Sequence, residues 1–129
     1  MQDAFTHYLA DGSSAHVPKV KITPEEGIEL IHSAGGIASI AHPLSLKLEG
    51  ETLMDELYRL KSLGLDAVEC YYNLHTSAQN SHFASMAARA GLLATGGSDF
   101  HGTPKPDVKL GHVILDEPLP MDVVEQIRP

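Results

Sequence analysis

Cysteine is nearly absent from these 129 residues, and long apolar runs are absent altogether. The single cysteine, Cys70, cannot form an internal disulfide, so nothing points to an oxidising compartment. The first twenty residues hold no apolar core of the signal-peptide type, and no later run is long enough to span a bilayer. We therefore expect a cytoplasmic protein that is neither secreted nor inserted in a membrane.

Basic residues are also few. Lys and Arg together number 9 against 17 Asp and Glu, which gives a formal net charge of -8. That balance argues against wrapping nucleic acid by bulk electrostatics, although a nucleotide could still be held in a local basic pocket. With 129 residues, 43% of them apolar and 20% charged, the chain has the size and composition of one folded globular domain.

Residues 1–22 and 23–129 differ in pattern. The first segment has no clear period and is expected to be an irregular lead-in, whereas helices and short apolar strands alternate in the second. Thr23 is a good helix N-cap, and Glu26 completes a capping box with it. The expected helices run from Thr23 to Gly35, from the cap Thr52 to Gly64, from Thr76 or Ser77 to Gly91, and within residues 120–129.

Short apolar segments follow these helices and predict strands. The expected strands are residues 37–41, 66–72, 92–95 and 112–115. The first of them is short and apolar, like a strand that is buried on both faces. Helices that alternate with such strands predict an α/β fold with a parallel sheet.

Titratable residues gather where the first three strands end. In parallel α/β folds, binding sites form at the C-terminal edge of the sheet. The strand ends carry His42, then Glu69, Tyr71 and His75, and then Asp99 and His101. Consecutive strands therefore present these groups at one edge, which favours a metal site or an acid–base site.

Asp99 and His101 form the most informative pair. Imidazole and carboxylate are usual ligands of Zn, Mn or Fe, and alternate residues of an extended segment face the same way. The glycines at positions 96, 97 and 102 would let the backbone bend tightly around the pair. The alternative is an aspartate that caps the following turn, beside a histidine on the surface.

Three ordered motifs resemble a known family. They are IASIAHP at residues 37–43, DAVECYYNLHT at 66–76 and LLATGGSDFHG at 92–102. Together with the flanking segments YLADGSSAHVPK and KPDVKLG, they are similar to the C-terminal part of the polymerase and histidinol phosphatase (PHP) family of metal-dependent phosphoesterases. The likeness covers nearly the whole chain and is greatest to the branch that acts on nucleoside 3',5'-bisphosphates or short RNA 5' ends.

The resemblance implies a distorted, TIM-like α/β barrel with two or three divalent metals, Mn, Zn or Fe, at its rim. In this chain His42 would bind one metal, Asp99 a second, and His101 a third or bridged one. The metals would activate a water for hydrolysis of a phosphate ester in a nucleotide, another phosphorylated small molecule or a short RNA end. For His42 the alternative is a buried imidazole bonded to the backbone.

Three further residues complete the candidate set. His75 matches a polar position of the family and would contact substrate or hold a ligand in place, unless it is a histidine on the loop surface. Lys19 and Lys105 lie, like Lys109, in segments that would flank the mouth of the site, where one of these lysines would bind a substrate phosphate as a point charge. The alternative for each lysine is a solvated side chain.

One departure from the family is large. Its members begin with a strand that carries a His-x-His pair, whereas the opening segment AFTHYLADG of this chain contains a lone His7 and no such pair. We therefore expect the C-terminal half of a PHP barrel, with about four mostly parallel strands, flanking helices and weak activity at most. The alternative is a non-catalytic remnant that serves as a binding or assembly module, and an in-frame His-x-His segment upstream of Met1 would distinguish the two.

Two further expectations concern architecture. An open half-barrel leaves an unpaired strand edge, so self-association through that edge is expected. An amidohydrolase-type barrel with a terminal metal-binding aspartate explains the SDFHG segment less well than a PHP barrel does.

Overall fold

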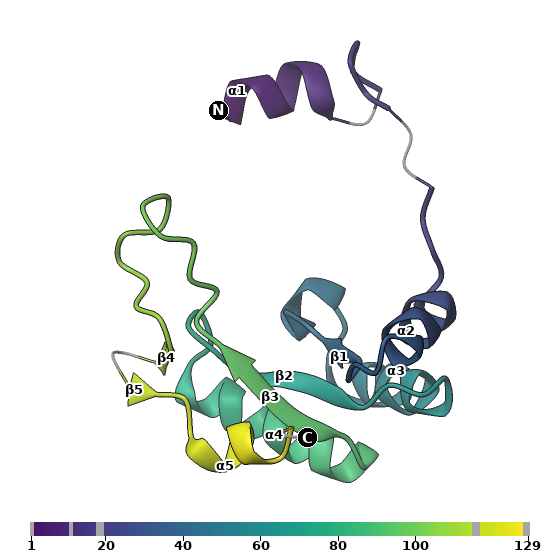
Figure 1. Ribbon diagram of the computed structural model, residues 1–129, viewed down its shortest axis with the longest axis vertical. Coiled ribbons are helices and arrows are strands. Elements are labelled where there is room, and N and C mark those ends of the chain that lie inside the picture. Colours follow the sequence, from purple (N-terminus) through teal and green to yellow (C-terminus); the bar gives the residue numbers. More distant parts are fainter. Residues whose placement is uncertain (1, 11, 18–19, 115–116, 128–129) are drawn as a thin grey trace.

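A parallel three-stranded sheet organises the protein, whose computed structural model describes residues 2–10, 12–17, 20–114 and 117–127. The strands are β1 (Ser39–Ile40), β2 (Ala67–Tyr72) and β3 (Leu93–Gly97), in the order β1-β2-β3 (Figure 1). The helices that precede and connect them are α2 (Pro24–Ser33), α3 (Gly50–Ser62) and α4 (Ser77–Ala90). The predicted α/β class with a parallel sheet and flanking helices is therefore confirmed.

Local capping chemistry explains where two of the helices begin. The Thr23 side chain accepts a hydrogen bond from the N–H of Glu26, whose carboxylate in turn accepts one from the N–H of Thr23. Thr76 and Gln79 form the same reciprocal pair at the start of α4. Both capping positions agree with the sequence prediction, because a cap depends only on the N-cap residue and the three residues that follow it.

Helix α3, the second of the four predicted helices, begins earlier than predicted. Thr52 was the expected cap, but α3 starts at Gly50, with Glu49 in the capping position. The Thr52 hydroxyl donates a hydrogen bond of 2.6 Å to the carbonyl oxygen of Glu49. A threonine in the first turn can bond backward to a carbonyl as well as forward to an N–H, so its type alone does not fix the helix start.

The core fills the space between the sheet and its helices. The central strand of the sheet, β2, is almost fully enclosed, with Ala67, Val68 and Cys70 at most 1% exposed. Burial raises the pKa of the Cys70 thiol to about 12, so this side chain is a packing residue. The helices contribute Leu53, Met54, Leu57 and Leu60 from α3 and Phe83, Met86, Ala87 and Ala90 from α4. This packing fixes the strand ends that carry the candidate site.

The first strand is shorter and more exposed than predicted. Only Ser39 and Ile40 of residues 37–41 pair with β2, and Ile37 is 45% exposed. The expectation of a strand buried on both faces is therefore wrong for this segment. In the described part of the chain β1 lies at the edge of the sheet, with β2 on one side and no strand on the other.

The fourth predicted strand does not extend the parallel sheet. Strand β4 (His112–Ile114) pairs antiparallel with β5 (Glu117–Pro118) in a separate two-stranded sheet. Only two residues separate these strands in the sequence, a connection that suits antiparallel neighbours, because parallel strands need a longer crossover. Residue 115 of the predicted strand lies outside the described residues. The short helix α5 (Met121–Glu125) follows, as expected within residues 120–129.

The first part of the N-terminal segment differs from the prediction. Residues 1–22 were expected to be irregular, but α1 (Gln2–Ala4) and η1 (Phe5–Leu9) form consecutive helical turns. The prediction missed them because the stretch is too short to show a helical apolar period. Figure 1 shows these turns apart from the sheet and its helices. Among the described residues, no helix is long and apolar enough to cross a membrane.

Candidate functional site

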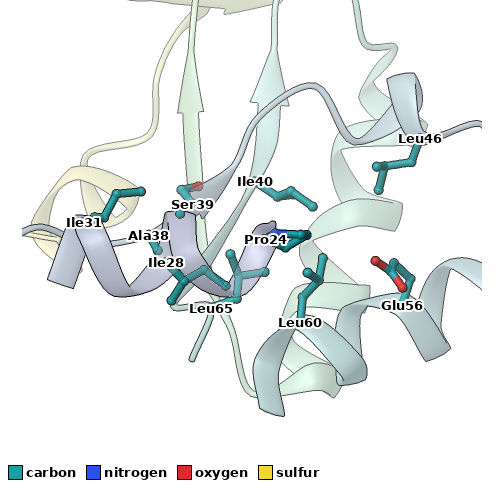
Figure 2. Close-up of a pocket in the computed structure, with 11 residues that line it drawn as sticks. Pro24, Ile28, Ile31, Ala38, Ser39, Ile40, Leu46, Glu56, Leu60 and Leu65 are labelled. Atoms are coloured by element: carbon teal, nitrogen blue, oxygen red, sulfur yellow. The ribbon is translucent and has the colours of Figure 1, made fainter. Parts of the chain in front are cut away.

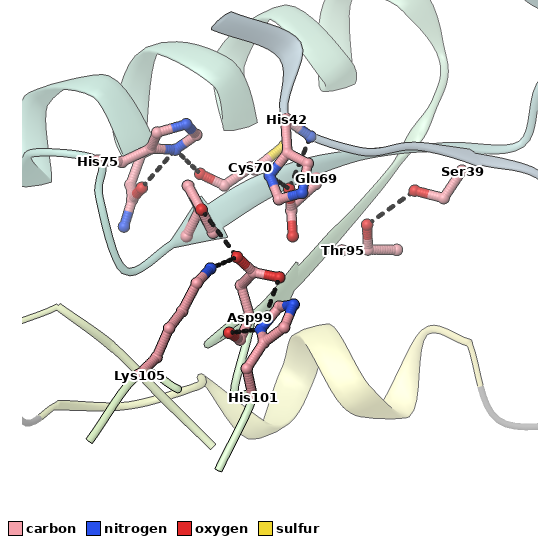
Figure 3. Close-up of polar contacts among 11 residues, drawn as sticks. Ser39, His42, Glu69, Cys70, His75, Thr95, Asp99, His101 and Lys105 are labelled. Atoms are coloured by element: carbon pink, nitrogen blue, oxygen red, sulfur yellow. Dashed lines mark hydrogen bonds and ion pairs between the residues drawn. The ribbon is translucent and has the colours of Figure 1, made fainter. Parts of the chain in front are cut away.

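His42 and Glu69 form the first half of the candidate site. His42 lies two residues beyond the end of β1, and Glu69 lies in the neighbouring strand β2. The His42 N–H donates a hydrogen bond of 2.8 Å to Glu69 Oε2, and His42 Nδ1 lies 3.3 Å from the same oxygen. The His42 side chain is 45% exposed, which rules out the buried, backbone-bonded alternative. Glu69 thus holds an imidazole that is partly exposed to solvent (Figure 3).

Asp99 is the centre of the second half. Its Oδ2 accepts hydrogen bonds from Lys105 Nζ and, at 3.2 Å, from the Tyr72 hydroxyl. His101 Nδ1 lies 3.5 Å from Asp99 Oδ1 and 2.6 Å from the Asp99 carbonyl oxygen. The hydrogen bond and charge of Lys105 hold the pKa of the Asp99 carboxyl below its usual value, and Asp99 raises the pKa of Lys105 in return. The carboxylate is therefore kept ionised, as a metal ligand must be.

Tyr72 connects the two halves. Its ring meets the His42 ring edge-on, with centroids 4.8 Å apart, while its hydroxyl donates to Asp99. Burial, followed by the charge of Asp99, raises the pKa of the Tyr72 hydroxyl, so it remains a neutral donor. The ends of three neighbouring strands thus meet through Tyr72, as the parallel sheet predicted.

The sequence prediction chose the wrong tyrosine. It named Tyr71 for the rim, together with Glu69 and His75, whereas the hydroxyl that reaches Asp99 belongs to Tyr72. The pairing of β2 with β3 shifts register between Glu69 and Tyr71, so strict alternation does not continue to the end of the strand. A register shift depends on the partner strand, and no signal in the sequence of β2 itself identifies Tyr72.

His75 is buried beneath this edge of the sheet. Its side chain packs between Tyr72 and Phe83, and the residue is only 4% exposed. Its Nδ1 lies 3.2 Å from the Cys70 carbonyl oxygen and 3.1 Å from Asn80 Oδ1, so Nδ1 carries the proton. The loop-surface alternative is wrong, and burial favours a role in positioning Tyr72 over direct contact with a substrate.

The glycines at positions 96, 97 and 102 were predicted to bend the backbone around Asp99 and His101, but they do not all have that role. Gly96 and Gly97 lie within β3, where a Cβ on Gly96 would stand 2.6 Å from both Cβ and the carbonyl oxygen of Tyr71. Gly96 therefore allows close approach of two strands, and among these glycines it is Gly102, with φ +67°, that turns the chain. Two site residues also have left-handed backbone: His42 with φ 49° and Asp99 with φ 52°.

The donors suit a divalent metal in type. Imidazole and carboxylate together are ligands of Zn, Mn or Fe, and the ammonium of Lys105 shows that Asp99 already faces a cation. Within the described residues, however, no cluster of three or more His, Cys, Asp or Glu side chains could hold a metal ion. His42–Glu69 and Asp99–His101 are two separate pairs of side chains of the metal-binding types.

An apolar cavity of about 350 Å³ lies elsewhere, between α2, β1 and α3 (Figure 2). Apart from Ser39 and Glu56, its lining side chains are apolar. Glu56 is engaged by Arg59, at 2.8 and 2.6 Å, and no lysine or arginine is among the lining residues in the described part of the chain. Lys105 lies at the strand ends, and Lys19 lies outside the described residues. The strand ends therefore remain the candidate site for phosphate chemistry.

Two curated proteins are similar to most of this chain. The 5'-3' exoribonuclease Rnm of Escherichia coli is 34% identical over 111 residues, which are 86% of this chain and 38% of the relative. The 3',5'-nucleoside bisphosphate phosphatase of Chromobacterium violaceum is 33% identical over 113 residues, or 87% and 39%. The chain thus spans about two fifths of the length of these relatives. No family model matches the sequence.

A solved structure supports the same relationship. A protein from Bifidobacterium adolescentis, named as a metal-dependent phosphoesterase, superposes with a TM-score of 0.67 and 29% identity. The match covers 98% of this chain and 43% of that one. The chain is therefore a relative of the PHP-type phosphoesterases, and its partial coverage fits the C-terminal portion of their domain.

Proposed function

We propose that this chain carries part of the active site of a metal-dependent phosphoesterase. The observation that carries the proposal is the convergence of His42, Asp99, His101 and Lys105 at neighbouring strand ends, linked through Tyr72. The substrate class is a phosphate ester of a nucleotide, of another phosphorylated small molecule or of a short RNA end. The names of the two curated relatives, a 5'-3' exoribonuclease and a nucleoside bisphosphate phosphatase, support this class.

Each side chain has a distinct role in this proposal. His42, Asp99 and His101 would hold two or three divalent metals, Mn, Zn or Fe, together with residues from the rest of a complete domain. Such metals supply a hydroxide-like water and stabilise the leaving oxygen. Glu69 orients the His42 ring, and Tyr72 orients Asp99 through a neutral hydrogen bond.

The lysines and His75 complete the proposal. Lys105 provides a point charge for a substrate phosphate, and Lys19 keeps the same proposed role although it lies outside the described residues. His75 holds Tyr72 from beneath. The proposed location is the cytoplasm, in keeping with the lone cysteine.

A non-catalytic binding or assembly module remains a second candidate. The observation in its favour is that the described donors occur as two pairs, whereas a catalytic metal normally takes three or more protein ligands.

Metal binding tests the proposed function directly. We expect the chain to bind Mn²⁺ weakly, measured by the loss of the free Mn²⁺ signal in electron paramagnetic resonance, and Asp99→Ala to remove most of that binding. Asp107→Ala is the matched control, because it deletes an exposed carboxylate from the same loop. Equal Mn²⁺ binding by wild type and Asp99→Ala would show that Asp99 is not a ligand.

The open edge of the sheet predicts self-association. Strand β1 offers unpaired backbone groups, and exposed Ile31 and Ile37 lie beside it. We expect dimers or larger species in light scattering at tens of micromolar protein. Ile37→Lys should reduce them, because a charged side chain at a strand edge opposes pairing, whereas Leu74→Lys, in the loop after β2, should not. A wild-type protein that stays monomeric and binds no apolar dye would refute this proposal.

A further inference from the structure

Lys105 occupies a position that a metal would also require. Its ammonium donates to Asp99 Oδ2, and Asp99 is the carboxylate that the proposed function assigns to a metal. The loop after β3 brings the two residues together across a sequence separation of six. Both side chains are only partly covered, at 41% exposed for Lys105 and 21% for Asp99. The pair therefore lies beyond the strand ends with both side chains partly exposed to solvent (Figure 3).

We propose that Lys105 is a resident counter-cation of Asp99, which an arriving divalent metal displaces and which then binds the phosphate of the substrate. This inference rests on the proposed function. It adds a sequence of binding events, in which metal binding frees the cation that the substrate needs.

Electrostatics favours the exchange. A divalent ion on Asp99 repels a neighbouring ammonium, and it carries twice the charge that lysine offers to the carboxylate. The lysine stem is flexible and its head is strongly hydrated, so a half-exposed Lys105 can leave at small cost. An ion pair this exposed is weak, which makes it replaceable.

The structure also keeps the carboxylate in place after the exchange. The Tyr72 hydroxyl donates to the same Oδ2 atom and carries no charge that would repel a metal. His101 stays beside the opposite oxygen, Oδ1. Asp99 therefore does not need Lys105 for its orientation, and the freed ammonium remains tethered close to the site.

Substitution of Lys105 tests the competition. In Mn²⁺ titrations we expect Lys105→Gln to bind Mn²⁺ about two- to fivefold more tightly than wild type, which matches the small free energy of an exposed ion pair. Lys105→Arg should bind Mn²⁺ more weakly than wild type, because a guanidinium forms bidentate hydrogen bonds with a carboxylate and is harder for the metal to displace. Lys109→Gln removes the same charge from the same loop and should change affinity by less than Lys105→Gln. Unchanged or weaker binding in Lys105→Gln would overturn the inference.

Chemical labelling tests the displacement itself. We expect saturating Mn²⁺ to raise the rate at which an amine acylating reagent modifies Lys105, followed by mass spectrometry, relative to Lys109 in the same sample. An unchanged or reduced rate at Lys105 would overturn the inference while leaving Asp99 as a ligand. Equal Mn²⁺ binding by Asp99→Ala and wild type would instead overturn the proposed function and the inference together.

Discussion

Fusing this chain to the N-terminal portion of a full-length relative is expected to turn near-background phosphate release into metal-dependent hydrolysis of a nucleoside 3',5'-bisphosphate. The physical reason is the number of ligands, because the described donors form only two pairs and the resemblance assigns the remaining ligands to a His-x-His strand and the segments that follow it. The bisphosphate phosphatase of Chromobacterium violaceum is a suitable donor of that portion. The measurement is phosphate release with and without a chelator.

Substitution within the fusion identifies the ligands. We expect Asp99→Ala or His101→Ala to lower hydrolysis by more than about 100-fold, since even the outer partners of metal ligands are worth about 10- to 100-fold. Asp107→Ala, an exposed carboxylate of the same loop, should leave hydrolysis unchanged. Hydrolysis that survives a chelator, or full activity in Asp99→Ala, would exclude the metal mechanism. Strong activity in the unfused chain would show that the two donor pairs suffice.

Gly96→Ala is expected to be the most damaging small substitution in the sheet. Its added Cβ would lie 2.6 Å from Tyr71 Cβ and from the Tyr71 carbonyl oxygen, and 2.7 Å from Leu119 Cδ1. The Cβ and the carbonyl oxygen of Tyr71 cannot move away by a side-chain rotation, so β2 and β3 must move apart. Overpacking of this kind costs about 1–3 kcal/mol in the free energy of unfolding, measured as a lower urea midpoint.

The neighbouring glycine provides the matched control. A Cβ on Gly97 would meet nothing closer than Glu69 Oε1 at 3.9 Å, which is an ordinary contact. Gly97→Ala should therefore be neutral or slightly stabilising, because alanine restricts the unfolded chain more than glycine does. Equal urea midpoints for the two variants would mean that the strands do not approach as closely at Gly96 as the structure indicates.

Features encoded within a few residues were predictable from the sequence. The capping box at Thr23 depends on a partner three residues away and forms as predicted, and Thr76, one of the two predicted starts of the later helix, caps α4. The meeting of strand ends was also predictable, because parallel strands end at a common edge of the sheet. This general rule placed His42 and Asp99 at the same edge of the sheet, at the ends of the strands on either side of β2, without knowledge of any distance between them.

Features that depend on distant parts of the chain could not be predicted. The involvement of Tyr72 follows from a register shift between β2 and β3, which is a property of the strand pair. The contact of Lys105 with Asp99 depends on the path of the loop after β3, which has no periodic pattern to read. The burial of His75 depends on α4 folding back over β2, where Asn80 and Phe83 meet the ring.

The left-handed backbone at His42 and Asp99 sets activity against stability. Residues with a Cβ pay about 1 kcal/mol or more for this conformation, whereas glycine adopts it freely. A chain selected only as an assembly module would become more stable with glycine at position 42, and it would lose nothing by the exchange. On the proposed function, glycine at position 42 or 99 would remove a metal-binding side chain, so a gain in thermal stability there would come with a loss of metal binding.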